Sequence, residues 1–222
     1  MRIDHWVTAV SASIFLLAGP VAAQDGSSKF KPSGFLGNAY SQMTEAQSPS
    51  GQTVKRWIAP EIKPGAYESI LIEPNVFYPQ PKSTQQVSAQ TLKDINAYFS
   101  EAVKRELTGL FKFASEPGPK TLRLRTAITS VAAKDMGLKP WQLLPIAFIA
   151  TGGKTSSDAS LAAEYEVQDT DTGKVVAVGM REGTGVQLKT ATAALTLADV
   201  KPVIDAWAKD MRAFIEATRQ KK

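Results

Sequence analysis

The stretch Thr121-Leu-Arg-Leu-Arg-Thr-Ala-Ile-Thr-Ser-Val131 decides the fold of this chain of 222 residues. Its side chains alternate between two faces, which is the period of a half-buried β-strand. Leu122, Leu124, Thr126 and Ile128 point to one face, and Arg123, Arg125 and Thr129 point to the other. Such a strand needs a sheet beside it and an apolar layer over one face. The segments on either side of it therefore have to supply both.

Two segments with helical periodicity can supply the apolar layer. Ser88 is suited to cap a helix that ends near Leu107, and Thr196 or Asp199 is suited to cap a helix close to the end of the chain. Both segments space their apolar residues three and four positions apart, as a helix packed on one side requires. These residues are Leu92, Ile95, Phe99, Val103 and Leu107 in the first helix, and Val200, Val203, Ile204, Trp207, Met211, Phe214 and Ile215 in the second.

Further segments are expected to pair with the central strand. Tyr67–Val76 reads as a first strand, Phe111–Ala114 as a short edge strand, and 159–168 and 174–184 as a hairpin around Asp169–Gly173. A strand, helix, strand start favours a right-handed parallel crossover, after which the sheet continues antiparallel. We therefore predict an α+β fold, a two-layer sandwich in which a mixed, mostly antiparallel sheet of four to five strands carries two helices on one face.

The chain divides into three predicted parts. Residues 1–23 combine a cationic start, an apolar run and a small-residue ending, which is the pattern of a secretory signal peptide cleaved after Ala23. Residues 24–66 are rich in Ser, Gly, Pro, Gln and Lys and are expected to form an irregular N-terminal arm. Residues 67–222 are expected to form a single α+β domain. We expect the protein in the periplasm, and not as a lipoprotein, because the sequence contains no Cys.

The composition excludes several kinds of chemistry. The single His, His5, falls in the predicted signal peptide, so the mature chain would have neither His nor Cys. It therefore cannot form a Ser-His-Asp triad, a Cys-His pair or an ordinary zinc site. The formal charge of +5 favours anionic surfaces such as lipid head groups, but no basic run with interleaved aromatics predicts nucleic-acid binding. We predict no enzymatic activity, no cofactor and no metal.

Two short motifs resemble ligand-binding loops. Phe148–Thr155 contains the Gly-Lys-Thr of a phosphate-binding loop, but Phe148 stands where the first Gly belongs. We interpret it as a loop and expect no nucleotide. Asp169, Asp171 and Gly173 resemble the start of a calcium loop, but Glu182 is too far along the chain to close it. A hairpin turn is the better interpretation.

Four charged residues form a candidate site on the predicted sheet: Arg123, Arg125, Glu164 and Glu166. One reading is a carboxylate pair for acid/base or glycoside chemistry, with the arginines binding the substrate. Catalytic carboxylates need unlike environments, whereas these two would share one face of one strand. We therefore interpret the four residues as a charge ladder on the solvent-exposed surface of the sheet.

The segment Pro140–Ala150 is apolar nearly all round and too short to span a bilayer. It either packs under the sheet edge or is exposed as a contact for lipid or a partner. Its candidate interaction residues are Trp141, Leu143, Leu144, Ile146, Phe148 and Ile149.

Several separated stretches are similar to one known family. They are Ser33-Gly-Phe-Leu-Gly37 with Tyr40-Ser41, Leu122–Thr129, Leu144-Pro145, Glu164–Gly173 with its Asp-Thr-Gly ending, and Ala206-Trp-Ala-Lys209. Together they resemble the bacterial family called domain of unknown function 3313. The resemblance implies a Gram-negative envelope protein, often a lipoprotein, with no catalytic residues to carry over. This chain departs from that pattern at Gln24, where a lipoprotein would have Cys.

The function expected from these observations is binding without catalysis. We expect an exported envelope protein that binds an envelope protein partner or the outer-membrane surface through the apolar segment. The alternative is a periplasmic carrier of a small apolar ligand or lipid, held in a pocket between the helices and the sheet. The identity of the partner and the oligomeric state do not follow from the sequence.

Overall fold

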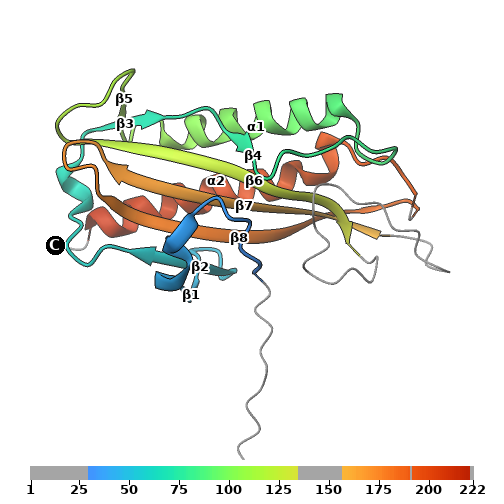
Figure 1. Ribbon diagram of the computed structural model, residues 1–222, viewed down its shortest axis with the longest axis horizontal. Helices are drawn as coiled ribbons and strands as arrows, with labels where there is room; N and C mark the ends of the chain where they lie inside the picture. The colour runs from blue at the N-terminus through green and yellow to red at the C-terminus, as the bar shows by residue number, and fades with distance from the viewer. Residues whose placement is uncertain (1–29, 135–156, 191, 221–222) are drawn as a thin grey trace, which may run out of the picture.

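The computed structural model describes residues 30–134, 157–190 and 192–220 (Figure 1). The predicted signal peptide, the apolar segment Pro140–Ala150 and the Gly-Lys-Thr motif lie outside these residues, so those interpretations stay predictions. The elements follow in the order η1 (Gly37–Gln42), β1 (Thr44–Gln47), β2 (Thr53–Ile58), η2 (Pro64–Ala66), β3 (Ser69–Ile72), β4 (Val76–Phe77), α1 (Ala89–Leu107), β5 (Lys112–Phe113), β6 (Thr121–Lys134), β7 (Ser157–Asp169), β8 (Val175–Leu188) and α2 (Leu197–Gln220).

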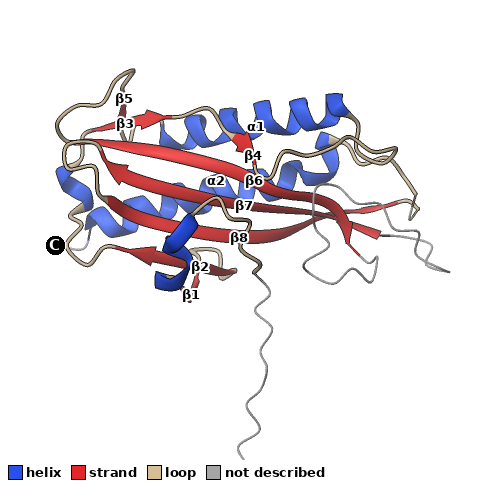
Figure 2. Ribbon diagram, viewed as in Figure 1, coloured by secondary structure: helices blue, strands red, loops and turns tan. Residues whose placement is uncertain are grey.

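The strands form one mixed sheet in the order β1-β2-β8-β7-β6-β3-β5, with the short β4 also pairing with β6. β6, β7 and β8 are antiparallel and form the long centre of the sheet, as the red arrows of Figure 2 show. β3 pairs in parallel with β6, and α1 lies between them in the sequence. The predicted parallel crossover is therefore confirmed, and so is the α+β class.

The predicted number of strands is wrong. The described part of the chain contributes eight strands to the sheet, not four to five. Two of the additional strands, β1 and β2, come from residues 24–66, which were expected to be an irregular arm. β2 gains its order from backbone pairing with β8, where Lys55 is opposite Met180 and Ile58 is opposite Ala177. Such long-range pairing leaves little trace in the local sequence.

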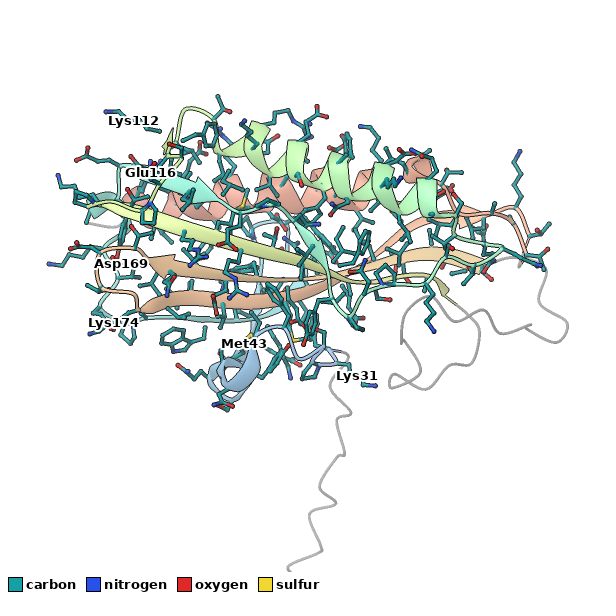
Figure 3. The ribbon with its side chains drawn as sticks, turned by 45° about the horizontal axis from the view of Figure 1, so that its top comes forward. Lys31, Met43, Lys112, Glu116, Asp169 and Lys174 are labelled. Carbon is teal, nitrogen blue, oxygen red and sulfur yellow. The ribbon has the colours of Figure 1, made fainter. Side chains whose placement is uncertain are left out.

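Both helices begin at the residues that the sequence indicates. The Ser88 side chain accepts a hydrogen bond from the backbone N–H of Thr91 at 3.0 Å, which caps α1. At the start of α2, the backbone N–H and the hydroxyl of Thr196 both donate to the Asp199 carboxylate, at 2.7 and 2.8 Å. Figure 3 shows α1 and α2 on one face of the sheet and η1, next to the labelled Met43, on the other.

The core lies between the two helices and β6 to β8. It is one cluster of buried side chains that includes Ile95, Leu107, Leu124, Ile128, Leu161 and Ile204. Two glycines of β8 let α2 approach the sheet closely. A Cβ atom added to Gly183 would lie 2.4 Å from Val203 Cγ1, and one added to Gly185 would lie 2.1 Å from the carbonyl oxygen of Asp199. A side chain at Gly183 would have to displace the Val203 side chain, and one at Gly185 would have to displace the backbone of the helix.

Candidate functional site

A cavity of about 570 Å³ lies between the two helices and the sheet. Its wall is formed by β2, β6, β7 and β8 on one side and by α1 and α2 on the other. Most of the wall is apolar. Several half-buried apolar side chains face the space, among them Ile58, Ile62, Val167, Met211, Phe214 and Ile215. The volume falls within the range of about 300–1,000 Å³ that is typical of small-molecule sites.

Small residues on the helix-facing side of the sheet make room for this cavity. Ala163 and Ala177 contribute little side-chain volume to its wall, and Gly179 follows Ala177 on the same face of β8. Gly179 lies between Tyr165 of β7 and Arg56 of β2 in the strand register. A Cβ atom at Gly179 would come within 2.6 Å of the Tyr165 ring, so the ring lies directly over this glycine. Gly179 is therefore what allows Tyr165 to reach across β8.

An ion pair lies in the wall of the cavity. Arg181 of β8 donates to Asp210 of α2 at 2.8 Å, and their side chains are only 13% and 6% exposed. The Arg181 guanidinium also lies 5.1 Å from the centre of the Trp207 ring. Burial lowers the pKa of Arg181, and the hydrogen bond to Asp210 opposes this change. Nε of Arg181 is buried and has no hydrogen-bond partner among the described residues.

Asp210 also fixes the turn between β1 and β2. The backbone N–H and the hydroxyl of Ser50 donate to its two carboxylate oxygens, at 3.0 and 2.9 Å. Burial raises the pKa of Asp210, but the hydrogen bonds from Arg181, Ser48 and Ser50 outweigh it and hold the pKa below the ordinary value. The ionised carboxylate therefore joins α2, β8 and the β1–β2 turn at one point.

On the opposite face of the sheet, the predicted charge ladder is only partly assembled. Arg125 pairs with Glu166, with 2.7 Å between Nη1 and Oε1. Arg123 pairs with Glu73 instead of with a carboxylate of β7. Glu164 does not join an arginine, and its exposed fraction is 1%. The prediction that Glu164 lies on a solvent-exposed ladder is therefore wrong, because the N-terminal residues cover it.

Glu164 holds those N-terminal residues on the sheet. It accepts hydrogen bonds from the Tyr40 hydroxyl at 2.6 Å and from the backbone N–H and hydroxyl of Ser33, both at 3.0 Å. Burial raises the pKa of Glu164, and the three hydrogen bonds oppose this increase. Sequence reasoning missed this cluster because its members are 124 and 131 residues apart. Glu164 is recognisable from the sequence as a charged strand residue, whereas Ser33 and Tyr40 come into view only through the family resemblance.

The remaining predicted sites have simple outcomes. The candidate interaction residues Trp141, Leu143, Leu144, Ile146, Phe148 and Ile149 lie outside the described residues. Asp169 accepts hydrogen bonds from the backbone N–H groups of Asp171 and Thr172, and Gly173 has a φ of 70°, which is the geometry of a hairpin turn. Within the described ranges, no group of three or more acidic, His or Cys side chains is placed to hold a metal ion. No helix in those ranges is long and apolar enough to cross a membrane.

Comparison with known families agrees with the resemblance noted in the sequence. The family described as "Protein of unknown function (DUF3313)" matches residues 31–211. The chain belongs to this family. A DUF3313 relative, the "Uncharacterized lipoprotein YdcL" of Escherichia coli K12, is 32% identical over 212 residues, which cover 91% of this chain and 95% of the relative. The relative is thus named a lipoprotein, whereas this chain contains no Cys.

The DUF3313 chain also has distant likenesses among solved structures. Protein XCC0632 from Xanthomonas campestris is 11% identical, with 70% of this chain and 87% of that one covered, at a TM-score of 0.42. PelC, a dodecamer from Paraburkholderia phytofirmans, is 9% identical, with coverages of 76% and 97% and a TM-score of 0.36. A minor lipoprotein from Acinetobacter baumannii is 13% identical, with coverages of 69% and 95% and a TM-score of 0.36. Likenesses of this size carry no conclusion about function.

Proposed function

We propose that this DUF3313 protein is a non-catalytic envelope protein that binds a small apolar molecule, such as a lipid chain, between its helices and its sheet. The observation that carries the proposal is the apolar cavity of about 570 Å³. A space of this size left empty forfeits contacts on every wall, and water inside an apolar space lacks the two to four polar partners that it needs. An apolar ligand satisfies both requirements.

The engaged state of the acidic residues supports a role without catalysis. Glu166 is paired with Arg125, and Glu164 accepts from three donors of Ser33 and Tyr40. A general acid or base needs access to a bound substrate. Both carboxylates instead hold parts of the protein together, on the face of the sheet that points away from the cavity.

One prediction and one comparison support the proposed envelope location. The predicted signal peptide would direct the chain to export, and the DUF3313 relative is named a lipoprotein. An envelope protein encounters lipids and other apolar molecules, which need a protein cover to cross an aqueous space. Association through Pro140–Ala150 stays a prediction, because that segment lies outside the described residues.

Ligand binding can be tested with a neutral apolar probe. The full chain is exported by a bacterial host and purified without detergent, and native mass spectrometry measures any retained apolar molecule. After delipidation, the protein is titrated with N-phenyl-1-naphthylamine, whose fluorescence increases in apolar sites. We expect a saturable increase, because the probe occupies the cavity.

Two variants with the same chemical change localise the binding. Ala177→Phe places a ring in the cavity wall and is expected to weaken probe binding by about tenfold or more. Ala213→Phe adds the same ring at an exposed position of α2 and is expected to leave binding unchanged. Thermal melts show that both variants are folded. The proposal fails if the wild type shows no saturable binding, or if a folded Ala177→Phe variant binds as the wild type does.

A further inference from the structure

Three of the polar side chains that line the largely apolar cavity come from neighbouring strands: Arg56, Tyr165 and Arg181. Arg56 of β2 and Tyr165 of β7 both lie opposite Gly179 of β8, and Arg181 is two residues further along β8. Side chains at these register positions point to the same face of a sheet. The three groups are therefore gathered at one place on the helix-facing side, while Glu164, next to Tyr165, points to the other face.

The Tyr165 hydroxyl is available to a ligand. It lies deep between the sheet and the helices, and no described residue forms a hydrogen bond with it. Burial raises its pKa, and the positive charges of Arg56 and Arg181 oppose this increase. The hydroxyl therefore stays protonated near neutral pH and can donate a hydrogen bond. Tyr165 is half-buried, and a hydroxyl in the cavity wall without a protein partner is free to bond a polar ligand atom.

Arg56 supplies a positive charge that no acidic side chain in the described part of the chain balances. Its guanidinium lies 4.4 Å from the centre of the Phe214 ring, and one of its nitrogens donates to the backbone oxygen of Gln47 at 3.2 Å. Among the described residues, no carboxylate pairs with it. The second arginine of the cavity, Arg181, is paired with Asp210. Two positive charges and one negative charge therefore face this part of the cavity, which leaves an excess of one positive charge.

We infer that the ligand is a single-chain amphiphile with an anionic head, and that Arg56 and Tyr165 bind the head while the apolar walls hold the chain. The guanidinium fork of Arg56 matches two oxygens of a carboxylate, and charge-assisted hydrogen bonds of this kind are roughly twice as strong as neutral ones. Nε of Arg181 offers a further buried donor at the same place. This inference rests on the function proposed above and names the chemical class of the ligand.

Competition between two matched ligands tests the inference. Dodecanoate and 1-dodecanol carry the same chain and differ in the charge of the head. Each is used to displace N-phenyl-1-naphthylamine from the delipidated full chain. We expect dodecanoate to displace the probe at a concentration about tenfold lower than 1-dodecanol, the factor expected for one charge-assisted hydrogen bond in a buried site.

Variants assign this preference to individual residues. Arg56→Met removes the charge but keeps an apolar stem, and it is expected to abolish most of the preference for dodecanoate without weakening 1-dodecanol. Tyr165→Phe removes only the hydroxyl and is expected to reduce the preference by a few-fold. Lys55→Met is the matched control, because Lys55 is the neighbouring cation on the opposite face of β2. It should keep the full preference.

The possible outcomes distinguish a failure of the anionic-head inference from a failure of the proposed ligand binding. If wild-type protein binds the probe but both ligands displace it equally, the inference is overturned and the proposed function stands. A preference that survives in both Arg56→Met and Tyr165→Phe, or that is lost equally in Lys55→Met, also overturns the inference. If no apolar molecule binds, both the inference and the proposed function fail.

Discussion

The first turn of α2 passes so close to Gly185 of β8 that a single methyl group there has a calculable effect. In Gly185→Ala, the new Cβ atom would lie 2.1 Å from the carbonyl oxygen of Asp199, whereas real Cβ contacts do not fall below 3.0 Å. The strand and the helix must therefore separate by at least 0.9 Å, the difference between these distances. The contacted atom is backbone, so it cannot rotate away as a side chain could. The Cβ of Ala159, at 3.3 Å, also limits movement of the new group.

Overpacking of this kind costs about 1–3 kcal/mol of folding free energy. For a chain of this size, each kcal/mol shifts the melting temperature by about 2–4 °C. We therefore expect Gly185→Ala to lower the Tm by about 2–12 °C in a melt followed by far-ultraviolet circular dichroism. Gly65→Ala is the control, because a Cβ there meets nothing within 4 Å, and its effect should stay within about 0.5 kcal/mol. If Gly185→Ala melts together with the wild type and the control, α2 does not pack on β8 as described.

Three further predictions concern the buried carboxylates. Asp210→Asn leaves Arg181 without its ionic partner and should cost about 3–5 kcal/mol in urea unfolding, whereas the double change Arg181→Met with Asp210→Leu should recover most of this loss. Tyr40→Phe removes the hydrogen bond to Glu164 and those that the hydroxyl accepts from the backbone N–H groups of Gly34 and Leu36. It should cost about 1–3 kcal/mol and should speed the proteolysis of residues 30–43 in the full chain. The pKa of Asp210 is lowered from 3.8, so the stability that it provides above that pH should disappear as the pH falls below it. The pKa of Glu164 is raised from 4.5, so between its folded pKa and 4.5 its contribution has the opposite sign and stability should rise as the pH falls.

Controls decide each of these expectations. Equal unfolding midpoints for the wild type and Asp210→Asn would show that the pair with Arg181 is not the buried contact described above. Unchanged proteolysis in Tyr40→Phe would mean that Glu164 does not hold the N-terminal residues. For the pH dependence, Asp210→Asn should show a smaller loss of stability below pH 3.8 than the wild type. Glu164→Gln should lack the gain in stability that the wild type shows as the pH falls towards 4.5. Variants that follow the wild-type curve would contradict these assignments.

The features of the fold that could be predicted are those with a local cause. The alternation in Thr121–Val131 is sufficient for a strand, the Ser88 hydroxyl caps α1, and Gly173 takes the positive φ that its turn requires. The strands β1 and β2 have no such local cause. β2 depends on pairing with β8, more than a hundred residues away, and β1, which is polar and shows no apolar alternation, pairs in turn with β2. A sequence of this kind reads as irregular until its partner strand is known.

The candidate site was less predictable than the fold because the cavity exists where small residues leave space unfilled. Small residues such as Ala163 and Ala177 have many uses, and nothing in their spacing shows that they face a common space. Glu164 was identified as a charged strand residue, but its burial depends on donors that lie far away in the chain. The pocket between helices and sheet was considered only as an alternative, because a two-layer arrangement permits such a space without requiring it.

The position of Asp210 has a thermodynamic consequence. The carboxylate connects Arg181 in the cavity wall with Ser50 in the β1–β2 turn at the sheet edge. Any ligand that binds more tightly when these bonds are formed must also make that turn more ordered. By reciprocity, whatever holds the turn in place raises the affinity of the ligand by the same factor. Binding at the edge of the sheet and ligand binding in the cavity would then be thermodynamically coupled.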